Sequence, residues 1–333
     1  MHSLSKPPFD VQLEAFMAQV PIPQNLEPEM IPMMRTALAQ ANTADLIISG
    51  RPIEHEEHTI PVPGGGEITL SVFRPTAVAA AAEGCAKKPG PGIYFIHGGG
   101  LVMGNRFLGM SVVADWIEEL DATCVSVEYR LAPEYPYPTP LEDCYAGLKW
   151  VEANLAMLGI DKSRLMIVGQ SAGGGLAAAL AILARDRGGP HICAQLLMCP
   201  MLDHRNTSVS VQQFSNEGTW SQKNNQTGWT CYLGDHGKAE TEQVDILASV
   251  GRATVANLLN LPSTFIDVGS AETFRDEDVA YANLLWEAGV QVELHVWPGG
   301  IHGFDLLLPT ADLSQRAIQT RTAWVKTILE RKE

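Results

Sequence analysis

The chain has 333 residues, of which 46% are hydrophobic and 18% are charged, and its formal net charge is −15. This composition is typical of a globular protein with a sizeable core, and it excludes global disorder. The acidity, together with the lack of any basic run longer than a pair of residues, excludes a protein that binds nucleic acid through its phosphates. We interpret the charge as an aid to solubility.

The first fifty residues contain two amphipathic stretches, at about 11–20 and 26–41. Two segments with alternating apolar side chains follow, at 54–61 and 67–74, and a run of three glycines at 64–66 separates them. A period of two predicts strands, and the glycines predict the turn of a hairpin.

From about residue 92 onward, short β-rich runs alternate with runs that have the period of a helix. This alternation predicts a mainly parallel sheet with helices on both faces. Strands are expected at 92–96, 123–128, 165–168, 192–198, 264–268 and 291–297. Helices are expected at 110–120, 141–158, 173–185, 275–288 and 313–330. Residues 1–50 and 204–250 do not fit the rhythm, and we expect both to cover an edge of the sheet as a lid on a single domain, 1–333.

A candidate nucleophile follows the expected strand at 165–168, which runs into GQSAG at 169–173 and then into a helix of small residues. A tight turn from strand to helix forces the central Ser171 into a strained backbone and exposes its hydroxyl above the sheet. Negative charge that develops there is stabilised by the helix N-terminus. An ordinary glycine-rich turn is the alternative, and the strand–turn–helix context favours the nucleophile.

The expected strand at 92–96 ends in HGGG at 97–100. Acyl transfer generates an oxyanion, which fixed backbone N–H groups stabilise. Consecutive glycines let these groups approach without a Cβ in the way. Alone, the motif would equally fit a flexible loop, but its pairing with the serine turn about seventy residues later favours an oxyanion site.

The candidate base is His302, in the loop PGGIHGF at 298–304 after the last expected strand. This position completes the chain order serine, acid, histidine that is typical of strand–turn–helix serine hydrolases. His295 is the competing histidine, but it falls inside the alternating strand, which favours a structural role.

The acid should lie just beyond the expected strand at 264–268, where four acidic residues begin a helix. Acidic residues at a helix start are often present only because they favour the helix dipole. Glu272 is closest to the strand end, whereas Asp276 and Asp278 should already lie on the helix. We therefore expect Glu272 to be the acid, with Asp276 as the alternative.

Together these motifs resemble the hormone-sensitive-lipase family of carboxylesterases over roughly residues 54–330. The resemblance rests on separated stretches in the family's order: YFIHGGG at 94–100, EYRLAPE at 128–134, LEDC at 141–144, GQSAGG at 169–174, IDVG at 266–269, FRDE at 274–277 and GF at 303–304. It implies an α/β-hydrolase fold with a helical cap formed by about 1–50 and 204–250. It also implies an oxyanion hole made by the N–H groups of Gly99, Gly100 and Ala172.

Two positions depart from the family's pattern. The family usually has aspartate before the serine, where this chain has Gln170, a change that alters local polarity but leaves the triad intact. The family's acid is usually aspartate as well, and the aligned position here is Glu272. Glutamate can also orient the imidazole, because this type of triad admits either acid.

These features predict a serine carboxylesterase that hydrolyses short- to medium-chain esters through an acyl-enzyme, with Ser171, Glu272 and His302 as its triad. An amidase, lactonase or lactam hydrolase with the same triad is the nearer alternative. The other is a ligand-binding protein on a hydrolase scaffold, as in the gibberellin receptors of plants. Such receptors typically lose a triad member, whereas all three positions here carry competent side chains.

The expected partner is a small-molecule ester; we expect neither a metal nor a cofactor, and leave a homodimer open. The longest apolar run, 176–184, is shorter than the roughly 18 residues of a membrane span. Residues 1–20 include Asp10 and Glu14 and lack a continuous apolar segment, so we expect no signal peptide. The six cysteines show no paired Cys-x-x-Cys spacing, which favours buried thiols in a reducing, cytoplasmic setting.

Overall fold

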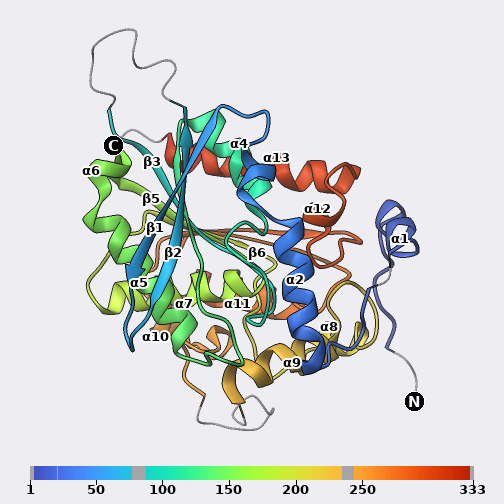
Figure 1. Ribbon diagram of the computed structural model, residues 1–333. Coiled ribbons are helices and arrows are strands. Elements are labelled where there is room, and N and C mark those ends of the chain that lie inside the picture. The colour runs from blue at the N-terminus through green and yellow to red at the C-terminus, as the bar shows by residue number, and fades with distance from the viewer. Residues whose placement is uncertain (1–3, 21, 77–87, 235–243, 331–333) are drawn as a thin grey trace.

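A computed structural model describes residues 4–20, 22–76, 88–234 and 244–330. Its centre is one sheet of eight strands in the order β1-β2-β4-β3-β5-β6-β7-β8 (Figure 1). The strands are β1 (Ile53–Pro61), β2 (Glu67–Pro75), β3 (Gly90–Ile96), β4 (Thr123–Val127), β5 (Ile160–Gln170), β6 (Ala194–Met198), β7 (Ser263–Gly269) and β8 (Val292–Trp297).

The sheet is mixed but mostly parallel. From β4 through β3, β5, β6 and β7 to β8, every neighbouring pair is parallel. β2 is antiparallel to β4 and to β1. The predicted α/β-hydrolase architecture is therefore confirmed, and the predicted hairpin is the pair β1 and β2. Its turn contains Gly64, Gly65 and Gly66, all with φ between +81° and +89°, a region that favours glycine.

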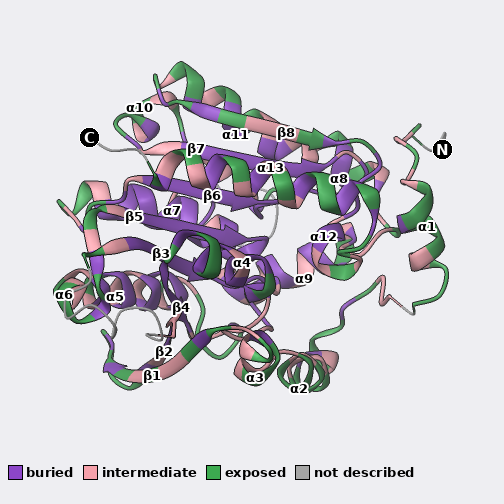
Figure 2. Cartoon of the chain, turned by 90° about the horizontal axis from the view of Figure 1, so that it is seen from above, coloured by how far each residue is buried: buried purple, intermediate pink, exposed green. Residues whose placement is uncertain are grey.

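Helices cover both faces of the sheet, as Figure 2 shows by the buried layer of strands between them. The helices are α1 (Val11–Met17), α2 (Ile31–Ala41), α3 (Ala44–Ile48), α4 (Met110–Leu120), α5 (Thr139–Ala153), α6 (Leu155–Leu158), α7 (Ala172–Asp186), α8 (Val209–Gln213), α9 (Gln222–Leu233), α10 (Val255–Leu258), α11 (Arg275–Glu287), α12 (Phe304–Leu307) and α13 (Asp312–Leu329). Two short 3₁₀ helices span Pro28–Met30 and Val250–Arg252.

The described residues form three apolar clusters, of which the two larger lie on opposite faces of the sheet and the third includes Leu13, Trp297 and Ile301. Tyr94 and Ile96 of β3 contribute to the cluster that contains residues of α5, α7 and α11. Ile93 and Phe95, which point to the other face, contribute to the cluster with α4 and α13. Because the central strands are buried on both faces, they carry continuous apolar runs rather than an alternating pattern.

The observed elements differ from the predicted ones mainly at their ends. The helix expected at 141–158 is divided into α5 and α6 at Asn154, whose side chain donates to the carbonyl of Trp150 at 2.8 Å and whose backbone leaves the helical region. Asparagine competes with the helix for such backbone bonds. The five-residue α3 was not predicted, and β5 begins five residues before the expected strand at 165–168.

The N-terminal segment and the segment after β6 are bonded to one another. Gln24 donates to the carbonyl of Gly218 at 2.9 Å, and Ser221 donates to the carbonyl of Gln24 at 2.6 Å. Asn224 accepts from the N–H of Leu26 at 2.8 Å. α1 lies at the margin of the molecule, near the N-terminus (Figure 2), and its Leu13 is buried in a cluster with Trp297 of β8. No helix in the described part of the chain is long and apolar enough to cross a membrane.

Candidate active site

The turn that carries Ser171 lies between β5 and α7. Ser171 has φ +54° and ψ −121°, a conformation that costs a non-glycine residue on the order of 1–3 kcal/mol. The flanking glycines make room for the turn. A Cβ on Gly169 would lie 2.2 Å from the carbonyl oxygen of Gly173, and a Cβ on Gly173 would lie 2.2 Å from that of Ile96. The N–H of Ser171 donates to the carbonyl of Met198, so the end of β6 supports the strained residue.

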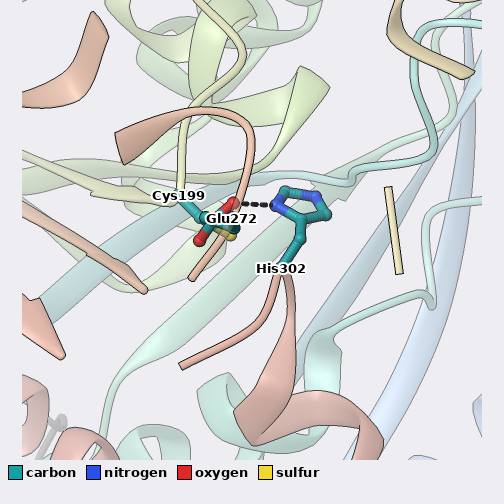
Figure 3. Close-up of side chains that lie close together, drawn as sticks. All are labelled: Cys199, Glu272 and His302. Carbon is teal, nitrogen blue, oxygen red and sulfur yellow. Dashed lines mark hydrogen bonds and ion pairs between the residues drawn. The ribbon is translucent and has the colours of Figure 1, made fainter. Parts of the chain in front are cut away.

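The structure brings Ser171, His302 and Glu272 together from three separate turns. His302 Nε2 lies 2.9 Å from Ser171 Oγ, and His302 Nδ1 lies 2.6 Å from Glu272 Oε2. Figure 3 shows the second contact as a dashed line. The other carboxylate oxygen of Glu272 accepts from the N–H of Gly269 at 2.9 Å. The carboxylate therefore holds the proton on Nδ1 and leaves Nε2 free to accept the proton of the serine hydroxyl.

Of the neighbouring acidic residues, Asp276 and Glu277 are bonded to other groups, and the buried carboxylate of Asp278 has no hydrogen-bond partner among the described residues. Asp276, the alternative acid, accepts from the N–H of Ser210 at 2.7 Å and from Arg275 at 2.8 Å. Glu277 accepts from two backbone N–H groups after β6, and burial raises its pKa well above the usual range. Burial does the same to the pKa of Asp278. Of these four acids, Glu272 is the one that contacts His302.

The histidine loop is held from several sides. Thr219 donates to the carbonyl of His302 at 2.5 Å, and the Phe274 ring packs edge-on against the imidazole, 4.9 Å between centroids. His295, the competing histidine, lies on β8, contacts Glu293 at 2.9 Å and stacks on Trp297. It therefore lies within the strand and contacts neither Ser171 nor Glu272.

Three buried charged residues form a network near the loop that carries His302. Arg321 of α13 bonds Asp267 of β7 at 2.7 Å and also pairs with Asp305 of α12, and all three are at most 3% exposed. The indole N–H of Trp297 donates to the same Asp267 oxygen at 2.9 Å. Burial raises the pKa of Asp267, and the charge of Arg321 opposes that rise. The network ties the helices that follow His302 to the central sheet.

The HGGG motif lies against the nucleophile, since a Cβ on Gly98 would be 3.2 Å from Ser171 Cβ. Gly99 and Gly100 have φ of +112° and +62°, which only glycine adopts readily. Among the described residues, no hydrogen-bond acceptor is paired with the N–H groups of Gly99, Gly100 or Ala172. Three unpaired donors beside a serine hydroxyl are suited to an oxyanion.

His97 supports the HGGG motif through ring stacking and hydrogen bonds. It is fully buried, stacks on Tyr129 with 4.2 Å between ring centroids, and its Nδ1 bonds the carbonyl of Gly98 at 2.7 Å. The Tyr129 hydroxyl donates to the carbonyl of His97 at 2.9 Å. Burial lowers the pKa of His97, so the ring is neutral at neutral pH. The residue supports the donors without adding charge to the site.

A cavity of about 290 Å³ opens above Ser171 and His302. Its lining is mostly apolar. Residues of the N-terminal segment and of the segment after β6 both contribute to it. The lining residues outside the HGGG motif include Phe16, Val20, Leu26, Met34, Leu38, Met103, Leu108, Gln170, Thr219, Trp220, Asn224, Leu306 and Leu307. An apolar pocket with a few polar groups at one point is typical of a small-molecule site.

Cys199 lies beside Glu272 and His302, and one ligand atom from each of the three falls within 4.8 Å of the others (Figure 3). This set could in principle hold a metal ion. Burial, and to a smaller extent the carboxylate of Glu272, raise the pKa of the Cys199 thiol well above its usual range. Metals bind the thiolate, and His302 Nδ1 already contacts Glu272. The contact between Glu272 and His302 is therefore suited to proton transfer, and the three residues together are poorly suited to binding a metal.

Two residues of the site carry no signal in the sequence. Trp220 lies in the segment 204–250, which does not fit the alternation of strands and helices, yet a Cβ on Gly100 would lie 2.4 Å from its ring. Thr219 has no motif around it, although it fixes the backbone of His302. Both belong to residues 204–250, where contacts come from distant segments rather than from local periodicity.

Comparison with known proteins gives the family context of this geometry. The sequence family described as alpha/beta hydrolase fold matches residues 93–306. The chain is 30% identical to carboxylesterase NlhH of Mycobacterium tuberculosis over 93% of both chains. It is 34% identical to esterase LipI of the same organism over 72% of this chain and 71% of LipI.

Among solved structures, a bacterial heroin esterase superposes with a TM-score of 0.87. It is 33% identical in sequence, and the match covers 97% of this chain and 98% of that one. The esterase LipW of Mycobacterium marinum gives a TM-score of 0.85 at 29% identity, over 98% and 99% of the two chains. The likeness therefore includes the segments outside the central sheet.

Proposed function

Since the chain belongs to the alpha/beta hydrolase fold family, in its hormone-sensitive-lipase group of carboxylesterases, and is a carboxylesterase, we propose that Ser171 is its nucleophile, His302 its base and Glu272 the acid that orients the base. The observation that carries this proposal is the pair of contacts that His302 makes, 2.9 Å to Ser171 Oγ and 2.6 Å to Glu272 Oε2.

Acylation begins when His302 Nε2 takes the proton of Ser171 while the serine oxygen attacks the ester carbonyl. The N–H groups of Gly99, Gly100 and Ala172 stabilise the oxyanion that forms. Glu272 stabilises the imidazolium. His302 then gives its proton to the leaving alcohol, and the acyl group remains on Ser171.

Deacylation repeats these steps with water as the nucleophile. His302 takes a proton from the water as it attacks the acyl-enzyme, and the same three N–H groups stabilise the second oxyanion. When this intermediate collapses, the proton returns to Ser171 and the carboxylic acid leaves. Each step is a proton transfer or an acyl transfer, and none needs a metal or an organic cofactor.

The pocket supports a preference for short- to medium-chain esters. Its volume of about 290 Å³ lies at the lower end of the roughly 300–1,000 Å³ usual for small-molecule sites. We assign residues 1–50 and 204–250 to a cap on the single domain formed by residues 1–333. The hydrogen bonds from Gln24 to Gly218 and from Ser221 to Gln24 support this assignment, because they join the two segments.

The five cysteines in the described part of the chain are free thiols, three of them buried. Free thiols are typical of a reducing compartment. We propose on this ground that the enzyme is cytoplasmic.

Substrate class is tested with p-nitrophenyl esters of graded acyl length, together with lactones and anilides, at matched concentrations. We expect the highest kcat/KM for short and medium acyl chains, because the pocket is small and apolar. Faster turnover of anilides or lactones would instead favour the amidase or lactonase alternative. A steady rise of kcat/KM up to long acyl chains would contradict the assignment of the cap as the limit of the pocket.

A further inference from the structure

The pocket above Ser171 has few polar side chains, and most of them are already paired within the protein. Thr219 donates to the carbonyl of His302, and Asn224 is bonded through both ends of its amide to the backbone of the N-terminal segment. The indole N–H of Trp220 donates to a neighbouring amide side chain. Ser171 and His302 are paired with each other. None of these groups is free to recognise a substrate outside the reaction itself.

Gln170 differs from these groups because its carboxamide is not paired within the described part of the protein. The residue lines the same pocket and is 6% exposed. Among the described residues, its carboxamide has no hydrogen-bond partner, and its polar atoms are not among those sealed away from solvent. An amide that solvent reaches can bond to water, and a ligand with matching groups can replace that water.

The carboxamide lies close to two glycines. A Cβ on Gly109, where φ is +87°, would be 2.5 Å from Gln170 Oε1. A Cβ on Gly303 would be 4.0 Å from Gln170 Nε2. Gln170 also directly precedes the nucleophile and ends β5. The residue therefore belongs to the pocket and is next to the nucleophile in the chain, where a hydrogen bond from its amide to the substrate can contribute to discrimination between substrates.

We propose that Gln170 is a specificity determinant, whose carboxamide binds a neutral hydrogen-bonding group, such as a hydroxyl or amide, next to the scissile ester. An amide offers one donor group and one acceptor, which matches a group that can also donate and accept. A charged substrate fits poorly, because the described residues that line the pocket include no lysine, arginine, aspartate or glutamate. This inference rests on the proposed function and refines it.

The test compares esters that differ by one hydroxyl. One pair varies the acyl part, with p-nitrophenyl butyrate and its β-hydroxy analogue. The other varies the alcohol part, with propyl butyrate and the ester whose propyl group carries a hydroxyl on its second carbon. The readout is the ratio of kcat/KM within each pair. We expect the wild type to prefer the hydroxylated ester in at least one pair, and that pair identifies which part of the substrate Gln170 contacts.

Gln170→Met keeps the length of the side chain and removes both hydrogen-bonding groups. In the preferred pair we expect the ratio to fall about ten- to a hundredfold, because the hydroxyl then lacks its partner. Gln170→Leu serves as a second variant if the first has a lowered melting temperature. Leu108→Ala is the matched control, since it changes an apolar part of the same wall and should move both esters of a pair in parallel.

Three results would overturn the inference. In the first, the wild type prefers the unsubstituted ester in both pairs. In the second, the two esters of each pair change in parallel in Gln170→Met. In the third, the ratio falls as much in Leu108→Ala. Failure of the proposed function looks different, because Ser171→Ala would then still hydrolyse p-nitrophenyl butyrate.

Discussion

Glu272 divides its carboxylate between two partners. One oxygen contacts His302 Nδ1 at 2.6 Å, and the other accepts the N–H of Gly269 at the end of β7. The residue is 3% exposed, so little water competes for either oxygen. Glu272 stands in the turn after β7, and its side chain reaches both Gly269, three residues earlier, and His302, so a shorter aspartate would have to give up part of this reach.

At the residue scale we predict that Glu272→Gln lowers kcat about 10³–10⁴-fold, since the amide keeps the shape but removes the charge that stabilises imidazolium. Glu272→Asp should retain part of the activity, because it keeps the charge with a shorter reach. Asp276→Asn is the control, and its kcat should stay within a few-fold of wild type. Steady-state kinetics on one p-nitrophenyl ester decides the matter. Near-normal turnover in Glu272→Gln would contradict the assignment of Glu272 as the acid. Loss of turnover in Asp276→Asn would favour Asp276 instead.

At the scale of elements, the strand β3 and the HGGG loop depend on a neutral imidazole. His97 is buried under the loop, and its desolvation lowers its pKa below the usual 6.5. A histidine with a lowered pKa in the folded state contributes stability above pH 6.5 and loses that contribution as pH falls through its folded-state pKa. The loop that carries the proposed oxyanion donors should therefore weaken on acidification.

We predict that the free energy of unfolding falls less steeply in His97→Gln than in the wild type when the pH is lowered from about 7.5 to about 5.5. One proton taken up only on unfolding gives a slope of at most about 1.4 kcal/mol per pH unit. Burial also lowers the pKa of His55 and His204, but both remain in the variant and cancel in the comparison. Urea titrations at several pH values measure the two slopes. Equal slopes would show that His97 takes up no proton on unfolding in this range.

The sequence predicted those parts of the site that are determined locally. The glycines at 169 and 173 admit the strained serine, and the loop after the last strand carries His302. Ser171, Glu272 and His302 each follow the carboxyl end of a parallel strand, and these ends lie at the same edge of the sheet. The pocket wall could not be predicted in the same way. Gln24 and Gly218 are 194 residues apart in sequence, and no local sequence pattern predicts such a contact.

At the scale of the whole molecule, the buried network around Arg321 joins β7, α12 and α13. Arg321 is 2% exposed and pairs with two carboxylates, Asp267 and Asp305. Burial alone would lower the pKa of the guanidinium, but the two carboxylates raise it. Loss of the arginine would leave both acids buried and without a cation.

We predict that Arg321→Met lowers the free energy of unfolding by about 3–5 kcal/mol, as expected when one partner of a buried ion pair is removed. The control is Arg205→Met, which removes an arginine whose side chain is 45% exposed, although its partner Asp203 is half-buried; pairs open to solvent contribute about 1 kcal/mol or less. Denaturant titration of the three proteins measures the difference. Equal losses in both variants would show that burial of the network contributes little.

The most direct test of the account is the identity of the nucleophile. Wild-type protein incubated with a p-nitrophenyl phosphonate should gain one adduct, and peptide mass spectrometry should find it on Ser171. Ser171→Ala should keep the melting temperature and lose turnover by on the order of 10⁴-fold or more, while Ser163→Ala, at an exposed serine, should retain both labelling and turnover. An adduct on another serine, or substantial turnover in Ser171→Ala, would contradict the account.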